Sequence, residues 1–249
     1  MLSRFDTAFG VARSLIVYYG QPWRRSALKR FYGDLVDPGN LVFDIGAHVG
    51  SRSETLMTLG ARVVAVEPQP ALADFIEKRM LHRLAAFERV AVGAHDGEIE
   101  LNISSRHPTV TTASKDFITK VSKTQGFRSV VWDQKIKVPM TTLDALIARH
   151  GMPVFCKIDV EGAEAEILKG LSQPISLIAF EYIPAVPAIA EAAIDELMRL
   201  GPYRFNRVIG EQHRFVDERW KSADALLMDL ASLSPDSPSG DIYARLEHR

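Results

Sequence analysis

Short apolar runs alternate with segments of helical periodicity along most of the chain. The apolar runs have the length of strands and cover Leu41–Ile45, Arg62–Val66, Phe87–Val92, Ile99–Ile103, Val154–Ile158 and Ile175–Glu181. Helical patterns follow four of these runs, starting at Ser51 and covering Ala71–Leu81, Ala163–Lys169 and Pro187–Leu200. Buried strands that alternate with helices are typical of a parallel sheet covered on both faces. With right-handed crossovers, this order predicts a doubly wound, mostly parallel, Rossmann-like α/β core.

Three stretches depart from this alternation. Residues 1–38 are expected to be an N-terminal helical extension that ends at Pro38-Gly39, because their apolar positions (Phe5, Phe9, Val11, Leu15, Val17) fall roughly on one helix face. Residues 39–249 are expected to form the α/β domain. Residues 104–135 are polar and lack clear periodicity, so we expect an insertion over the ligand-binding edge of the sheet. Residues 232–240 are expected to form a loop before a short last strand.

A turn with two glycines, Asp44–Gly50, follows the first apolar run. Ser51 and Glu54, just beyond it, have the spacing of a capping box for the next helix. Glycine lets a ligand approach the backbone closely, and a helix N-terminus favours negative or polar ligand groups. The turn is therefore a candidate ligand site.

An acidic residue, Glu67, ends the second run and precedes Pro68. In a doubly wound sheet this carboxylate lies beside the first turn, where it can accept hydrogen bonds from a ribose diol. The turn lacks the middle glycine of the dinucleotide fingerprint, since His48 stands there, and Asp44 would repel a pyrophosphate. S-adenosylmethionine has no phosphate and carries an ammonium and a sulfonium, so it tolerates this acid. A nicotinamide or flavin cofactor and a packing turn without ligand are the alternatives.

A second charged segment, Lys157–Gly162, follows a later apolar run. A buried charge must be paired, so we expect Lys157 to contact a carboxylate. Asp159 and Glu161 follow the carboxyl end of the strand, where ligands bind in open α/β sheets, and Asp159 could face the charged end of the methyl donor. The alternative is a purely structural ion-pair cluster, with Glu161 and Glu164 stabilising the helix dipole.

Five segments of the chain form a recognisable set: LVFDIGAHVG (41–50), VVAVEPQP (63–70), VAVGAHDGEIEL (90–101), VPMTTLDALI (138–147) and CKIDVEGAEAEILKGL (156–171). In these segments, and in their order and spacing, the chain resembles the FkbM-type methyltransferases. The resemblance covers roughly residues 40–182. It implies a class I methyltransferase fold for residues 39–249, and methyl transfer to oxygen on small molecules, glycans or lipid-linked sugars.

The resemblance also implies which residues of this sequence bind the cofactor, at the positions that match the family's motifs. Gly46 and Gly50 match the cofactor turn, Glu67 the ribose ligand and Ala91–Ala94 part of the adenine pocket, while Asp159 is implied near the donor methyl group. One departure is His48, which stands where Asn is common. The full set expected to bind S-adenosylmethionine is Asp44, Gly46, Ala47, His48, Gly50, Glu67, Pro68, Ala91, Val92 and Asp159.

Methyl transfer to an alcohol benefits from a base within hydrogen-bond reach. The expected catalytic residues are Asp159, Glu181 and His213, and His107 is a further candidate base. Glu181 is preferred to the histidines as the base because it ends an apolar run near the expected pocket; a surface or packing role is the alternative for each residue. No His or Cys cluster has zinc-ligand spacing. We therefore expect no metal, and leave a divalent ion held by Asp159 and a second acid as an alternative.

Composition and charge limit which partners and cellular locations are expected. The net charge of −1 gives no general attraction to nucleic acid or anionic membranes, and the single cysteine, Cys156, excludes an intramolecular disulfide. Neither a signal peptide nor an apolar run of about 18 residues is evident, so we expect a cytoplasmic protein without an integral membrane segment. A small-molecule or glycan acceptor is expected rather than nucleic acid. A nicotinamide-dependent oxidoreductase and a catalytically silent cofactor-binding protein are the alternative functions.

Overall fold

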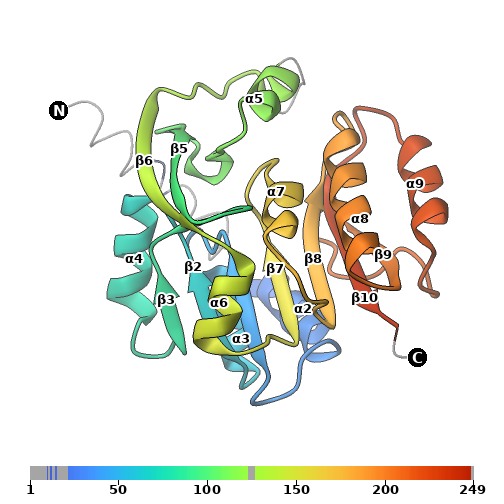
Figure 1. Ribbon diagram of the computed structural model, residues 1–249, viewed down its shortest axis with the longest axis horizontal. Helices are drawn as coiled ribbons and strands as arrows, with labels where there is room; N and C mark the ends of the chain where they lie inside the picture. Colours follow the sequence, from blue (N-terminus) through green and yellow to red (C-terminus); the bar gives the residue numbers. More distant parts are fainter. Residues whose placement is uncertain (1–9, 11, 13–14, 16–21, 123–126, 248–249) are drawn as a thin grey trace.

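A seven-stranded sheet forms the centre of the computed structural model, which describes residues 10, 12, 15, 22–122 and 127–247 (Figure 1). Its strand order is β3-β2-β1-β7-β8-β10-β9, and only β10 runs antiparallel to its neighbours. The strands are β1 (Leu41–Ile45), β2 (Arg62–Val66), β3 (Ala86–Glu88), β7 (Phe155–Ile158), β8 (Leu177–Tyr182), β9 (Tyr203–Ile209) and β10 (Gly240–Leu246). The predicted mostly parallel α/β sheet is confirmed.

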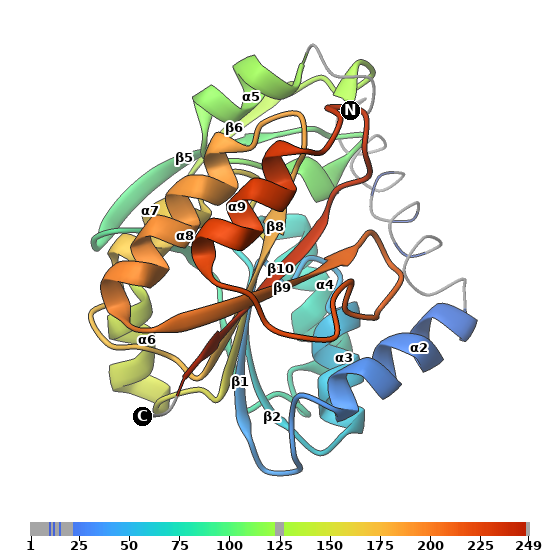
Figure 2. The ribbon, with the colours of Figure 1, turned by 90° about the vertical axis from the view of Figure 1, so that its right-hand side faces the viewer.

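Helices cover both faces of this sheet, as Figure 2 shows. One face carries α2 (Pro22–Gly33), α3 (Ser51–Thr58) and α4 (Pro70–Met80). The other carries α6 (Leu143–His150), α7 (Glu164–Lys169), α8 (Ala188–Leu200) and α9 (Ala223–Ala231). All residues of β1 and β7 are buried, which explains why both strands appear in the sequence as continuous apolar runs. None of the helices in the described ranges has the length and apolarity needed to cross a bilayer.

The predicted run at 87–92 is wrong as a single strand. Its first part belongs to β3 at the edge of the main sheet, whereas β4 (Ala91–Val92) pairs with β6 in a separate three-stranded sheet. Arg89 lies between the two strands, and its guanidinium contacts Asp74 at 2.7 Å and Glu77 at 3.0 Å on α4. These contacts hold the connection on the helix surface at the point where the chain leaves the main sheet.

The small sheet has the order β4-β6-β5 and frames the predicted insertion. Its antiparallel strands β5 (Gly97–Ile103) and β6 (Gln134–Thr141) enclose a segment with the 3-10 turn η1 (Pro108–Val110) and the helix α5 (Lys115–Val121). The sequence did not predict α5. It begins at Ser114, whose hydroxyl accepts the Phe117 N–H, and it buries Phe117 and Val121 against Val186. That residues 104–135 are an insertion into a domain of residues 39–249 stays a prediction.

The N-terminal extension can be judged only in part. Residues Pro22–Gly33 form α2, which ends five residues before Pro38, while Phe5, Phe9, Val11 and Val17 lie outside the described residues. That residues 1–38 form a helical extension stays a prediction.

The capping box predicted at the start of α3 is absent. Gly50, with φ 72°, is the N-cap, so Ser51 is already the first helical residue and its hydroxyl cannot cap the helix. The Glu54 carboxylate instead contacts Arg25 at 3.3 Å and Arg83 at 3.4 Å. The left-handed conformation of Gly50 therefore decides where the helix begins.

Candidate active site

The glycine turn wraps over the carboxyl ends of β1 and β2. Gly46, His48 and Gly50 all have positive φ, at 79°, 54° and 72°. The Gly46 and Ala47 N–H groups donate to the Val66 carbonyl at 2.9 and 3.0 Å. A Cβ on Gly46 would lie 2.0 Å from the backbone carbonyl oxygen of Asp159, the residue that follows β7. The close approach of two chain segments therefore requires glycine at this position.

Glu67 is buried beside this turn and is 5% exposed. Each of its carboxylate oxygens accepts one backbone N–H at 2.8 Å, from His48 and from Gln69. Burial raises the pKa of Glu67 to about 7, although these two hydrogen bonds oppose the shift. Each carboxylate oxygen has a second lone pair, so Glu67 can still accept hydrogen bonds from a ligand.

A cavity of about 260 Å³, here called the donor cavity, opens beside Glu67 at the carboxyl ends of the strands. Its walls are mainly apolar, and Thr109 and Thr111 of the predicted insertion complete them. Seven of the ten residues expected to bind the cofactor line it: Gly46, His48, Glu67, Pro68, Ala91, Val92 and Asp159.

The other three expected residues, Asp44, Ala47 and Gly50, do not line the donor cavity. Asp44 is 1% exposed and accepts a hydrogen bond from Ser53 on α3, and burial raises the pKa of its carboxyl group. This hydrogen bond therefore connects α3 to β1 beneath the turn. Ala47 and Gly50 are part of the backbone of the turn itself. Asp44 was expected to bind the cofactor, and the sequence alone did not show that its side chain is hydrogen-bonded to Ser53 outside the cavity lining.

Lys157 is fully buried at the end of β7. Its ammonium nitrogen lies 3.4 Å from Asp159 Oδ2 and 3.1 Å from Asp241 Oδ1, which confirms the expected carboxylate partner. Burial alone would raise the pKa of Asp159, but Lys157 and Arg52 outweigh it and hold that pKa below its usual value. Asp159 is thus an ionised residue that belongs both to an ion-pair cluster and to the cavity wall, so the two alternatives for it are compatible.

A second cavity of about 130 Å³, here called the acidic cavity, adjoins the first. Gly46, His48, Thr109 and Asp159 line both cavities. The remaining charged residues of the acidic cavity are Arg52, Glu161, Glu181, Glu211 and Asp241. The two cavities therefore meet at Asp159 and His48.

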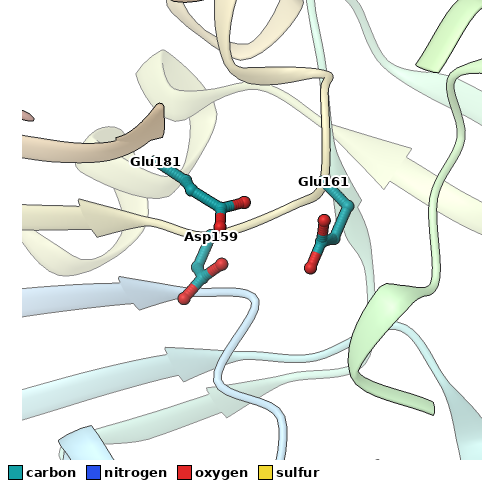
Figure 3. Close-up of side chains that lie close together, drawn as sticks. All are labelled: Asp159, Glu161 and Glu181. Carbon is teal, nitrogen blue, oxygen red and sulfur yellow. The ribbon is translucent and has the colours of Figure 1, made fainter. Parts of the chain in front are cut away.

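Three carboxylates gather in the acidic cavity. Figure 3 shows Asp159, Glu161 and Glu181 pointing into one space from neighbouring backbone segments, and an oxygen of each lies within 4.8 Å of the others. Burial, followed by the charge of neighbouring acids, raises the pKa of Glu161 and Glu181 well above the usual value. Glu181 therefore lies in the acidic cavity close to Asp159, and its role as a base stays a prediction.

The two histidines proposed as bases line neither cavity. His213 Nε2 lies 3.3 Å from Oε2 of Glu211, a residue of the acidic cavity lining. His107 precedes η1. The histidine that does line both cavities is His48, whose pKa burial lowers to about 4, so its imidazole is neutral at neutral pH.

Sequence reasoning missed Arg52, Glu211 and Asp241. Arg52 lies in the first turn of α3, and its guanidinium contacts Glu211 at 3.4 Å and Asp241 at 4.0 Å. The position of Arg52 directly after the glycine turn was a usable signal. Glu211 and Asp241 lie near the C-terminal end of the chain and had no local motif to mark them.

A family model described as the methyltransferase FkbM domain matches residues 44–233. No curated protein matches the chain.

Solved structures to which the chain is similar include three methyltransferases. A precorrin-6Y C5,15-methyltransferase from Geobacter metallireducens shares 13% identity at a TM-score of 0.47, covering 91% of this chain and 89% of that one. Magnesium protoporphyrin IX methyltransferase from Synechocystis, with bound S-adenosylmethionine, shares 13% identity at a TM-score of 0.47, covering 95% and 84%. An O-methyltransferase from Bacillus cereus, in complex with S-adenosylhomocysteine, shares 12% at 0.44, covering 96% and 90%.

The residues around the donor cavity fit S-adenosylmethionine. A buried carboxylate, an apolar wall and an ionised aspartate match its ribose diol, its adenine and its cationic end, respectively. The cofactor is S-adenosylmethionine, and the protein is an S-adenosylmethionine-dependent methyltransferase of the class I α/β fold. Because the family model spans most of the sequence, the chain belongs to the FkbM methyltransferase family.

Proposed function

We propose that the protein transfers a methyl group to a hydroxyl oxygen of a small molecule, a glycan or a lipid-linked sugar. The observation that carries this proposal is the junction of the two cavities at Asp159. One cavity has the apolar wall and the carboxylate that suit the donor, and the other is lined by polar groups that suit a hydroxylated acceptor. A shared wall allows donor and acceptor to be aligned, which can supply a large part of the rate enhancement.

Each cofactor contact follows from the lining of the donor cavity. Glu67 accepts hydrogen bonds from the ribose diol, and Ala91 and Val92 pack against the adenine. Asp159 faces the cationic end of the donor, where its low pKa keeps it charged. Gly46 lets the ligand approach the turn.

Glu181 is the proposed proton acceptor. The acceptor oxygen forms a bond to the methyl carbon while the carbon–sulfur bond breaks, so the sulfonium becomes a thioether and the hydroxyl proton passes to the carboxylate. A pKa raised by burial and by neighbouring acids makes Glu181 a better base than a fully hydrated carboxylate. In this scheme Asp159 positions the donor, and His213 acts through Glu211 as a positioning residue.

The acidic lining also bears on the acceptor class. Five carboxylates line the acidic cavity against two neighbouring cations, Arg52 in the lining and Lys157 paired with Asp159 and Asp241, so a phosphate placed beside them is disfavoured. This supports a neutral hydroxylated acceptor rather than a nucleic acid backbone. A nicotinamide cofactor is not favoured, because the family match names methyl transfer. The cytoplasmic location stays a prediction.

The test has two stages. Isothermal titration should give one site per chain for S-adenosylmethionine and for S-adenosylhomocysteine. Incubation of host extracts and glycan fractions with labelled donor should then label a product whose methyl group is attached to oxygen. A protein that binds the donor but labels nothing would be the catalytically silent alternative, and a methyl group on nitrogen or carbon would contradict the oxygen acceptor.

A further inference from the structure

The chain's own cations do not balance the charges of the acidic cavity. Lys157 contacts Asp159 and Asp241, and Arg52 contacts Asp241 and a neighbouring glutamate. Glu161 and Glu181 form no ion pair with any residue in the described ranges. Two carboxylates without an ion pair in these ranges therefore lie together beside Asp159, whose own partner is Lys157.

The geometry of the three carboxylates suits a common ligand. Asp159 and Glu161 lie in the connection between β7 and α7, and Glu181 lies in β8, so two segments of the chain present one oxygen from each of the three residues. These oxygens lie within 4.8 Å of one another. Oxygens that ligate one Mg²⁺ or Ca²⁺ at about 2.0–2.6 Å cannot be more than about 4–5 Å apart, so the observed spread is compatible with shared coordination.

Two buried oxygens supply a separate observation. Glu161 Oε2 and Glu164 Oε2 are inaccessible to solvent and accept no hydrogen bond within the described part of the chain. Glu164 is only 1% exposed, its other oxygen accepts the Gly162 N–H at 3.2 Å, and its charge is among those acting on Glu161 and Glu181. Buried carboxylate oxygens without a partner are unfavourable unless a proton or a cation satisfies them.

We infer that Asp159, Glu161 and Glu181 bind a divalent cation on the acceptor side of the donor cavity. All three ligands are carboxylates, so the chemistry favours a hard ion such as Mg²⁺, Mn²⁺ or Ca²⁺ over zinc. A charge of +2 matches the two carboxylates, Glu161 and Glu181, that have no ion pair within the described residues. This replaces the expectation, drawn from sequence, that no metal is bound.

The inference rests on the proposed methyl transfer and gives the ion a role in it. An acceptor hydroxyl that ligates the ion loses its proton more readily, because the cation stabilises the alkoxide. A bound ion lowers the pKa of Glu181 as well as that of the hydroxyl, so stabilisation of the alkoxide, rather than a raised pKa of Glu181, would favour proton transfer to the second carboxylate oxygen of Glu181. The methyl–sulfur bond breaks as the methyl–oxygen bond forms, so no oxidant or reductant is needed.

Manganese binding to the protein loaded with S-adenosylhomocysteine tests the inference directly. Free Mn²⁺ is measured by electron paramagnetic resonance for the wild type, Glu161→Gln, Glu181→Gln and the matched control Glu191→Gln, an exposed position on α8. We expect one Mn²⁺ per wild-type chain, displaced by Mg²⁺. Each cluster variant should bind about tenfold more weakly or worse, and the control should match the wild type.

Binding of S-adenosylhomocysteine, followed by thermal shift, separates the two proposals. Protein that binds the nucleoside but no Mn²⁺ up to about 1 mM overturns the cation site alone. Equal Mn²⁺ affinity in the wild type and both cluster variants overturns it as well. Failure of the wild type to bind the nucleoside overturns the proposed function instead. If one glutamine variant does not fold, Glu→Asp at the same position keeps the charge but shortens its reach, and weaker Mn²⁺ binding is still expected.

Discussion

Glu67 should make binding of S-adenosylhomocysteine depend on pH near neutrality. The carboxylate is 5% exposed and its pKa lies at about 7, because burial outweighs the hydrogen bonds from Gln69 and His48. A ribose diol donates to the ionised carboxylate, so protonation of Glu67 removes acceptor capacity and weakens binding.

The size of the effect follows from the ionised fraction. With a pKa of about 7, roughly nine-tenths of Glu67 is ionised at pH 8 and one-tenth at pH 6. Affinity should therefore fall by about tenfold over this range, or about 1.4 kcal/mol. In the ligand-free protein, folding raises the pKa of Glu67 from 4.5 to about 7. Its contribution to folding stability is therefore fully present below pH 4.5 and is lost as the pH rises through about 7. Ligand binding and ligand-free stability should thus change in opposite directions with pH.

Isothermal titration between pH 6 and pH 8 at constant ionic strength measures this dependence. Glu67→Gln should bind more weakly at pH 8 by about 1.5–3 kcal/mol and should show a flat profile. Glu191→Gln, which is exposed on α8, should keep the wild-type profile. Glu161 and Glu181 also have raised pKa values, so the comparison with Glu67→Gln isolates the contribution of Glu67. Equal wild-type affinity at pH 6 and pH 8, or a tenfold fall that persists in Glu67→Gln, would refute the reasoning.

Three further substitutions test the close backbone approach at the glycine turn and the buried ion pairs beside it. Gly46→Ala places a Cβ 2.0 Å from the Asp159 carbonyl at a φ of 79°, so nucleoside binding should be lost and stability should fall by about 2 kcal/mol or more; normal titration heat would contradict this. Lys157→Met leaves Asp159 and Asp241 without their buried cation and should lower the free energy of unfolding by about 3–5 kcal/mol in denaturant titrations, whereas a loss below about 1 kcal/mol would show that the pair matters little. Asp159→Asn leaves Lys157 paired with Asp241, so we expect turnover to drop by about 100-fold with a small change in melting temperature. A large stability loss with unchanged turnover per folded molecule would instead support a purely structural Asp159.

Much of the α/β framework could be predicted because it depends on local burial. The strands β1 and β2 match the predicted runs, since nearly all of their residues are buried and the pattern is continuous. Gly170 ends α7, as its place after the periodic segment predicted. The glycine turn and Glu67 were found for the same reason: each directly follows a strand whose limits the sequence makes clear.

The sequence did not predict β9 or α9. In β9, buried and partly buried residues are interspersed and polar residues interrupt the sequence, so no continuous apolar run marks the strand. The place of β10 could not be predicted either, because it pairs antiparallel between β8 and β9 and that order depends on contacts between distant segments. Strand order decides which side chains share a cavity.

What the sequence by itself determined is therefore the class of fold, the turn and the acids at the strand ends. Only the tertiary structure decided which of these groups meet. It placed Asp241 of β10 against Lys157 of β7, turned Asp44 away from the donor cavity and left His213 outside both cavities. It also brought Glu181 to Asp159. Local patterns establish where a strand ends, whereas the direction of a side chain and its partners across the sheet depend on pairing between segments far apart in the chain.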